Sequence, residues 1–426
     1  MKTALIMAKK GCAIMTSVNY LNAVNFVKIA PETLNESRQT LNAFTRNRKM
    51  SFAQALEFML DMRKTTLQTR LNLYFGKAGD EAPMSQQAFS KLRMNFDHSP
   101  FEKMHNLTVM QEYTESNDPT LWHGYHVFGV DGSYLQLPRA KELFEFFGIH
   151  GRPPQCPNAG ISILFDVMHG WAVDPVITTA NMSERDECLG HVNRLCERLP
   201  NIAAKSIILL DRGYPSLRLI KDLLPTGVKF VMRTSSNFLK EVTSAPLGDT
   251  IVTRDGAELR VVKIVLKTGE VQTLVTNLFD LPESLFQELY FKRWGIETAY
   301  FKLKRQLCIE KFTGKTVNSI FQDFWANMVL LNAVAVFQAE ADQLVSQRAA
   351  PDDKHQYRAR TSDLIISLRD RFIFAVFCSD NEFAIAEIEN VITTMARSVS
   401  AIRPDRSFPR IHRPFSRVEA NLKSHL

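Results

Sequence analysis

Residues 206–211, SIILLD, form a continuous apolar run that ends in an acidic residue. A run of this kind, without the alternation of a half-exposed strand, is typical of a central parallel strand that is covered on both faces. A helix is predicted after Pro215, followed by a strand at 229–233, KFVMR. Because ligands of open α/β sheets bind at the carboxyl ends of strands, Asp211 is predicted to lie where a functional site forms.

The chain before this run is also strand-like. Residues 125–138, YHVFGVDGSYLQLP, contain a β-rich run into Asp131, and residues 159–177, AGISILFDVMHGWAVDPVI, predict a hairpin with its turn near Gly170. A helix capped by Ser183 follows. The resulting order, β-β-β-α-β-α-β, matches the start of a ribonuclease H-like domain.

Strand-like sequence continues between residues 234 and 280, with turns predicted at 255–256 and 268–269. A long helix follows from about residue 282 to 307, with Asp280 as its N-cap. We therefore expect an α/β fold with a β-rich insertion ahead of this helix.

The helix includes residues 289–304, LYFKRWGIETAYFKLK. At about 100° per residue, four polar side chains fall within an arc of roughly 60°: Tyr290, Arg293, Glu297 and Lys304. Much of the remaining surface is apolar: Phe291, Trp294, Ile296, Phe301 and Leu303. This pattern predicts a buried helix whose polar stripe faces a partner or a site. The alternative is an ion pair between Arg293 and Glu297 on a solvated face.

Three carboxylates are candidates for one site. Asp131 lies in the first strand, Asp211 ends the central strand, and Glu297 belongs to the helix stripe. Two divalent cations would offset the cost of burying them and would support phosphoryl transfer. Ligand sets without His or Cys favour Mg²⁺, for which Mn²⁺ can substitute. The alternative is that each aspartate only caps a turn or a helix.

The chain has 426 residues and a net charge of +7, with a pI near 9.0, which favours a polyanionic partner. The basic residues of segment 37–97, which outnumber its acidic ones about two to one, are Arg38, Arg46, Arg48, Lys49, Arg63, Lys64, Arg70, Lys77, Lys91 and Arg93. Capping patterns at Ser51 and Ser85 make this segment helical. It is either a DNA-contacting module or a bundle with a solvated basic face.

The C-terminal 26 residues are also basic, and they either wrap DNA or form a solubilising tail. Their basic residues are Arg403, Arg406, Arg410, Arg413, Arg417 and Lys423. The six cysteines are scattered without a CxxC pair, which fits a reducing cytosol. The longest apolar stretch, residues 324–337, is shorter than a membrane span and predicts a core helix, so we expect no membrane partner.

The spacing Y-x2-R-x3-E-x6-K of the helix stripe resembles the signature of bacterial DDE transposases of the insertion sequence four family. GVDGSYLQLP (129–138) and LLDRGYPS (209–216) resemble the segments around the first two catalytic aspartates of that family. EKFTGKT (310–316) and IFQDFWANMVLLN (320–332) are similar to its downstream helical region. The resemblance covers roughly residues 40–345.

The resemblance implies that Asp131, Asp211 and Glu297 are the catalytic triad and bind two metal ions. It also implies that Tyr290, Arg293 and Lys304 hold DNA phosphates. The partners would be double-stranded DNA, both the terminal inverted repeats of the element and the target, and a second copy of the chain in a synaptic dimer. The localisation would be bacterial, cytoplasmic and nucleoid-associated.

The expected domains are an N-terminal helical, DNA-binding region (1–120), a ribonuclease H-like catalytic domain (121–345) with its insertion at about 234–280, and a C-terminal helical region with a basic tail (346–426). The base-stacking tryptophan that the family carries on the insertion has no counterpart, because none of the four tryptophans lies in that segment. The function implied is cut-and-paste transposition. The alternatives are a nuclease of the same fold that only hydrolyses DNA and a non-catalytic DNA-binding protein derived from a transposase.

Overall fold

The computed structural model describes residues 15–46, 48–77, 83–115, 121–151, 155–235, 237–350, 353–377 and 381–403. Apart from Arg403, the basic residues of the C-terminal tail lie outside these ranges. The chain divides into two compact units. The sheet unit comprises Tyr113–Leu135 and Asn158–Phe301, and the helical unit comprises the remaining segments.

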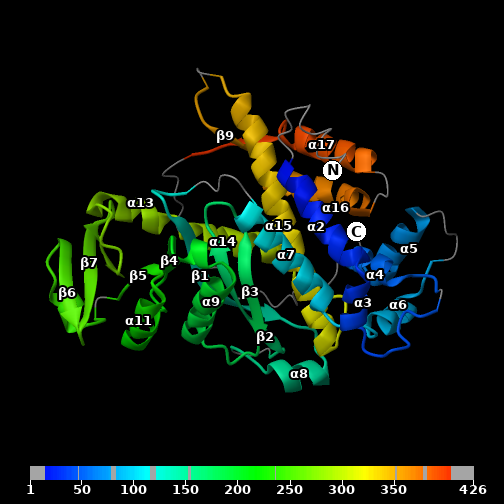
Figure 1. The fold of residues 1–426 in the computed structure, drawn as a ribbon, viewed down its shortest axis with the longest axis horizontal. Coiled ribbons are helices and arrows are strands. Elements are labelled where there is room, and N and C mark those ends of the chain that lie inside the picture. The colour runs from blue at the N-terminus through cyan, green and yellow to red at the C-terminus, as the bar shows by residue number, and fades with distance from the viewer. Residues whose placement is uncertain are drawn as a thin grey trace. The chain divides into compact units, whose positions relative to one another are not determined.

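The sheet unit is built on one mixed sheet of eight strands in the order β3-β2-β1-β4-β5-β8-β7-β6 (Figure 1). The strands are β1 (His126–Gln136), β2 (Asn158–Asp166), β3 (Ala172–Thr178), β4 (Ser206–Leu210), β5 (Lys229–Arg233), β6 (Gly248–Arg254), β7 (Ala257–Val265) and β8 (Val271–Thr276). β4 runs parallel to both β1 and β5, as predicted for SIILLD. This α/β arrangement with a large mixed sheet is consistent with the expected ribonuclease H-like fold.

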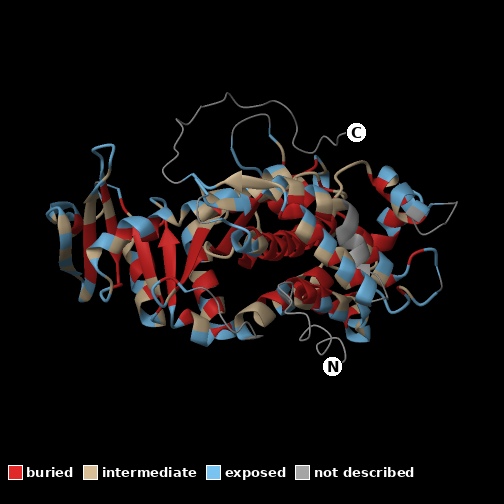
Figure 2. Cartoon of the chain, turned by 90° about the horizontal axis from the view of Figure 1, so that it is seen from above, coloured by how far each residue is buried: buried red, intermediate tan, exposed pale blue. Residues whose placement is uncertain are grey.

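The helices of this unit are α9 (Glu184–Arg198), α10 (Pro200–Ala203), α11 (Leu217–Leu223), α12 (Lys240–Ser244), α13 (Phe286–Phe291) and α14 (Trp294–Phe301). One face of the sheet forms a core with α13, in which Val127, Ile207 and Val231 meet Phe286 and Leu289. α9 and α11 lie in front of the sheet in Figure 1. The central strands are therefore buried on both faces, as Figure 2 shows.

Local sequence signals explain the connections. Gly170 adopts a positive φ in the β2–β3 hairpin, and the Ser183 side chain accepts a hydrogen bond from the backbone of Asp186 at the start of α9. Asp255 and Gly256 both have positive φ and join β6 to β7 in a two-residue turn. These features were predicted and are confirmed. β6, β7 and β8 extend the sheet beyond β5, whereas their status as an insertion stays a prediction.

The helical unit is centred on α15 (Val317–Gln347), whose residues are mostly buried. Its other elements are α2 (Met15–Ile29), α3 (Pro31–Ser37), α4 (Phe52–Met59), α5 (Leu67–Lys77), α6 (Gln86–Arg93), most of α7 (Ser99–Glu115), α8 (Lys141–Phe147), α16 (Thr361–Phe377), α17 (Asn381–Met395), β9 (Tyr357–Ala359) and β10 (Val399–Ala401). By length and composition, α15 is the one helix of the described segments that could cross a membrane. However, 94% of its most apolar window is buried inside the protein, which confirms the predicted core helix.

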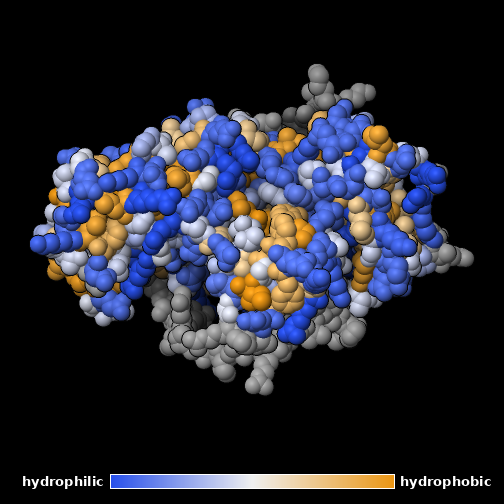
Figure 3. Space-filling model, turned by 90° about the horizontal axis from the view of Figure 1, so that it is seen from below, coloured by the Kyte–Doolittle hydropathy of each residue, from blue (hydrophilic) through white to orange (hydrophobic). Residues whose placement is uncertain are grey.

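The basic N-terminal segment is not uniformly solvated. Arg93 is buried and joins α6 to α15 through Gln322 and Asp323, and Arg70 is buried beside Asp61. Arg46 and Arg48 are exposed. Elsewhere, hydrophilic side chains cover most of the face in Figure 3, with hydrophobic patches between them. The basic residues of this segment thus divide into buried residues with structural contacts and exposed residues.

The predicted continuous helix over 282–307 is wrong in two respects. The chain forms a 3₁₀ turn at Glu283–Leu285, then α13, a break at Lys292 and Arg293, α14, and a π-helical segment at Lys302–Gln306. Asp280 does not cap it, because its carboxylate accepts a hydrogen bond from the Tyr125 hydroxyl.

The expected burial of the aromatic side chains on this segment is also wrong. Phe291, Trp294 and Phe301 are 72%, 53% and 56% exposed, and only Ile296 and Leu303 of the predicted apolar set are buried. The helix therefore packs through a narrow stripe.

That stripe depends on two glycines. A Cβ on Gly129 of β1 would lie 2.2 Å from Cδ1 and 2.8 Å from Cγ1 of Ile296, so the isoleucine occupies the space above the glycine. Gly295 faces Val167 of the hairpin, where a Cβ would lie 3.2 Å from the valine Cβ. These close approaches place α14 directly on β1.

We expect Gly129→Ala to lower the free energy of unfolding by about 1–3 kcal/mol, because the added methyl overpacks this contact. The cost should shrink in an Ile296→Ala background, which removes the two atoms that lie within 3.0 Å of the added methyl. Urea unfolding of the two single variants and the double variant measures this coupling. Gly76→Ala, with no atom within 4 Å of its Cβ, is the control. Additive costs at Gly129 and Ile296 would contradict the contact.

Candidate active site

The sheet brings two of the predicted carboxylates together. Asp131 lies in β1 and Asp211 directly follows β4. The parallel register pairs Gly129 with Leu209, so two residues further on Asp131 is level with Asp211. Asp131, midway along β1, thus lies beside Asp211, which follows the carboxyl end of β4.

Backbone hydrogen bonds orient these carboxylates. Oδ1 of Asp131 accepts a hydrogen bond from the Gly132 amide at 2.9 Å, and Oδ1 of Asp211 accepts one from the Gly213 amide at 2.8 Å. For neither aspartate does Oδ2 have a hydrogen bond to the residues that the structure describes. Each side chain is held in place with one oxygen left for a ligand.

The proximity of the two aspartates has an electrostatic cost. Burial, and then the negative charge of Asp211, raise the pKa of Asp131 to about 7. The Gly132 amide and Arg293 act in the opposite direction but do not outweigh these effects. Two neighbouring carboxylates of like charge are stabilised when one of them binds a proton or when both bind a cation.

The third predicted carboxylate, Glu297, lies on α14. Its Oε1 is 3.1 Å from a guanidinium nitrogen of Arg293, and both side chains are partly buried. The ion pair between Arg293 and Glu297 is the alternative considered from the sequence, but the two side chains are partly buried and do not lie on a fully solvated face. The negative charge of Asp211 also stabilises the charged form of Arg293, so this guanidinium interacts electrostatically with both Glu297 and the end of β4.

The other two stripe residues lie in different surroundings. The Tyr290 side chain is buried, and its hydroxyl donates a hydrogen bond to the Leu210 carbonyl at 3.3 Å. Burial raises the pKa of Tyr290 to about 12, so the phenol stays protonated at neutral pH. Lys304 belongs to the π-helical segment, which groups with the helical unit. The phosphate-binding roles of Tyr290, Arg293 and Lys304 stay predictions.

Sequence reasoning missed a further carboxylate, Glu184, the first residue of α9. A Cβ on Gly132 would lie 2.7 Å from its Oε1, and a Cβ on Gly213 would lie 3.6 Å from its Oε2. Glu184 therefore lies beside the residues that follow both aspartates. Its position at a helix start resembles an ordinary first-turn acid, and only the two glycines signal the close approach.

The donor set fits hard divalent cations. Asp131, Asp211 and Glu297 would hold them, because carboxylate oxygens are the ligands that Mg²⁺ and Mn²⁺ prefer. Among the described residues, no three His, Cys, Asp or Glu side chains are already spaced to hold an ion. The side chains of Asp131 and Asp211 repel each other, and Glu297 is turned to Arg293. The available Oδ2 atoms of the two aspartates are the observation that supports the fit.

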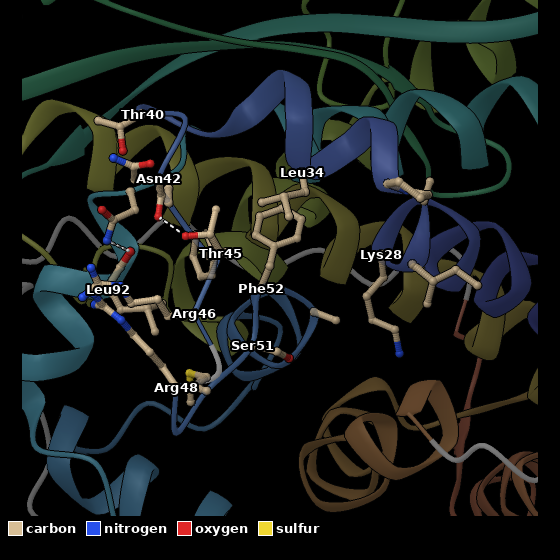
Figure 4. Close-up of a pocket in the computed structure, with 18 residues that line it drawn as sticks. Lys28, Leu34, Thr40, Asn42, Thr45, Arg46, Arg48, Ser51, Phe52 and Leu92 are labelled. Atoms are coloured by element: carbon tan, nitrogen blue, oxygen red, sulfur yellow. Dashed lines mark hydrogen bonds between the residues drawn. The ribbon is translucent and has the colours of Figure 1, made fainter.

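A pocket lies in the helical unit (Figure 4). This pocket has a volume of about 740 Å³, and its lining includes Lys28, Arg46, Arg48, Thr40 and Asn42. Arg46 and Arg48 lie together on one side of the pocket in Figure 4. Lys28 is paired with Glu57 at 3.0 Å, so the two arginines carry the exposed positive charge.

Comparisons with known proteins found a family match for the middle of the chain. Residues 122–333 match the family described as Transposase DDE domain. A solved structure, the cryo-EM structure of a piggyBac transposase synaptic complex with hairpin DNA, aligns over 87% of this chain and 85% of that chain, with 14% identity and a TM-score of 0.47. No curated protein matches the chain. The matched segment, residues 122–333, is similar to the transposase DDE domain and contains all three predicted carboxylates.

The raised pKa of Asp131 predicts a pH dependence of stability. Its folded-state pKa of about 7 exceeds the ordinary value of 3.8, so the folded protein binds more protons than the unfolded chain between these pH values. Stability therefore falls as pH rises through this window.

In buffer with a chelator, we expect Asp131→Asn to raise the free energy of unfolding at pH 8 by about 2–4 kcal/mol. The difference from wild type should vanish near pH 4, where the unfolded chain is also protonated. Urea unfolding at several pH values measures it. An Asp131→Asn variant that is less stable than wild type at pH 8 would show that the carboxylate is stabilised in the fold.

Proposed function

We propose that the protein is a DNA transposase that cuts the ends of a mobile element and joins them to target DNA. The observation that carries this proposal is the pairing of Asp131 and Asp211 across β1 and β4, with Arg293 interacting with both and Glu297 paired with Arg293. The match of residues 122–333 to the transposase DDE domain supports it.

The proposed chemistry uses two Mg²⁺ ions, for which Mn²⁺ can substitute, bound by Asp131, Asp211 and Glu297. Bound there, the ions would supply activation of the attacking oxygen and stabilisation of the leaving oxygen. Water first attacks a phosphodiester at the element end, and the bond that breaks leaves a free 3′ hydroxyl. That hydroxyl then attacks a phosphodiester of the target, so one bond forms as another breaks. The protonated Tyr290 is not a nucleophile in this scheme.

We propose that Arg293 binds a DNA phosphate next to these carboxylates, because its fork of N–H donors matches phosphate oxygens. Its ion pair with Glu297 keeps the guanidinium oriented until DNA arrives. Tyr290 and Lys304 are proposed as further phosphate contacts. We also propose a homodimer, since two element ends have to be brought together.

Glu297→Ala should reduce cleavage and strand joining by about 100-fold or more, because it removes a ligand of the charge-stabilising ions. Binding to the inverted repeats should remain. A gel assay with Mg²⁺ and a labelled duplex carrying the repeats that flank the gene measures both. Glu197→Ala, at an exposed position of α9, is the control and should cut normally. Normal cutting by Glu297→Ala would remove Glu297 from the triad.

The same assay separates the alternatives. A nuclease of this fold would release cut ends without transferring them into a second duplex. A non-catalytic DNA-binding protein would bind the repeats with no cut product in Mg²⁺ or Mn²⁺. Joining of the cut 3′ end to the second duplex is the result that the transposase proposal requires.

The arginines of the pocket in the helical unit are proposed to contact the DNA backbone. We expect replacement of both Arg46 and Arg48 by alanine to weaken DNA binding at all sequences. The slope of log K against log salt concentration should become less steep by about 2, since each lost phosphate contact accounts for about 0.9. Fluorescence anisotropy across a salt series measures the slope. Lys141→Ala, an exposed residue of α8, is the control, and an unchanged slope would contradict the contact.

A further inference from the structure

Glu184 is an acidic side chain held against the site without a partner of its own. Among the described residues its carboxylate has neither a hydrogen bond nor an ion pair, although its oxygens face the backbone of Gly132 and Gly213. Asp211 lies on the same side, because a Cβ on Gly213 would be 3.2 Å from Oδ1 of Asp211 and 3.6 Å from Oε2 of Glu184. A carboxylate kept this close to another one costs free energy unless a cation lies between them.

Hydrogen bonds from the residue after Glu184 help to hold Glu184 in this position. The neighbouring Arg185 donates hydrogen bonds to the carbonyls of Gly213, Tyr214 and Pro215, at 2.9 Å, 3.1 Å and 3.4 Å. These bonds tie the start of α9 to the loop that follows Asp211. The absence of a side chain at Gly132 leaves the space into which the Glu184 carboxylate extends. The position of Glu184 therefore follows from the hydrogen bonds of Arg185 to this loop and from the space at Gly132.

A second observation points to a ligand at the same place. Tyr214 is fully buried, and its hydroxyl has no hydrogen-bond partner among the described residues. After burial, the charges of Asp131 and then of Cys188 and Glu184 contribute to raising the pKa of Tyr214, so its proton is retained. A buried donor without an acceptor costs about 1–3 kcal/mol. Glu184 is among the charged groups near this hydroxyl, and its carboxylate would supply the missing acceptor if the side chain turned.

We propose that Glu184 is a fourth carboxylate ligand of the divalent-cation site formed with Asp131 and Asp211, and that Tyr214 positions it. The inference rests on the proposed function, since it concerns the same cations. Four carboxylates match the charge of two divalent ions, whereas three leave one positive charge in excess. When Glu184 turns onto a cation, its second oxygen accepts the hydrogen bond of the Tyr214 hydroxyl.

Calorimetric titration of the chelator-treated full chain with Mn²⁺ tests this proposal without relying on catalysis. We expect Glu184→Gln, which keeps the side-chain volume, to weaken Mn²⁺ binding by about tenfold or more. The control is Glu187→Gln, the same substitution about one helix turn further along α9, which should bind Mn²⁺ as wild type does. Asp211→Asn should lose binding as well, which tests the proposed function separately.

Unchanged binding by Glu184→Gln, together with loss in Asp211→Asn, would overturn the Glu184 proposal and leave the proposed function standing. Wild-type protein that binds no Mn²⁺, or equal binding by all variants, would overturn both. Tyr214→Phe gives an independent readout: without Mn²⁺ its Tm should equal or exceed that of wild type, and the rise in Tm on adding Mn²⁺ should be smaller. A lower Tm without Mn²⁺ would show that the hydroxyl already has a partner, and would overturn its role.

Discussion

The packing of Ile296 into the space above Gly129 fixes the geometry on which the rest of the sheet unit depends. A side chain at position 129 would collide with Ile296, so that either the Ile296 side chain or α14 would have to shift, and Glu297 is the next residue along α14. The same strand carries Asp131 two residues after the glycine. One contact between an isoleucine and a glycine therefore sets how closely a helix carboxylate approaches a strand carboxylate. Gly295 against Val167 reinforces the approach from the hairpin side.

Electrostatic cost is concentrated where this packing brings acids together. Asp131, midway along β1, lies beside Asp211 at the carboxyl end of β4, and Glu184 lies close to the glycines that follow the two aspartates. Arg293, which directly precedes α14, brings a positive charge to this cluster, and the Arg185 guanidinium donates its hydrogen bonds to backbone carbonyls. A fold that stabilised only itself would not be expected to collect unpaired carboxylates in this way. The arrangement is explained if the stability lost in the free chain is recovered when cations bind.

Much of the sheet was predictable because its signals are local. SIILLD indicated a central strand, Ser183 capped its helix, and Asp255 with Gly256 formed the expected turn. The prediction of a continuous helix over 282–307 failed because periodicity assumes unbroken α-helical geometry, whereas a turn at Lys292 and Arg293 separates α13 from α14. Trp294 is exposed for the same reason, since burial depends on which stripe meets the sheet. Glu184 escaped notice because its site forms only in three dimensions, and acids at helix starts usually complement the helix dipole.

The most direct test of the account is the position of bound Mn²⁺ in a crystal of the full chain, located by anomalous scattering. We predict a peak within coordination distance of both Asp131 and Asp211, at about 2.0–2.2 Å from their oxygens. A peak there would establish that the paired strand ends form a metal site. An Mn²⁺ peak at other residues only, or none at saturating Mn²⁺, would contradict the claim that this carboxylate cluster is the catalytic centre.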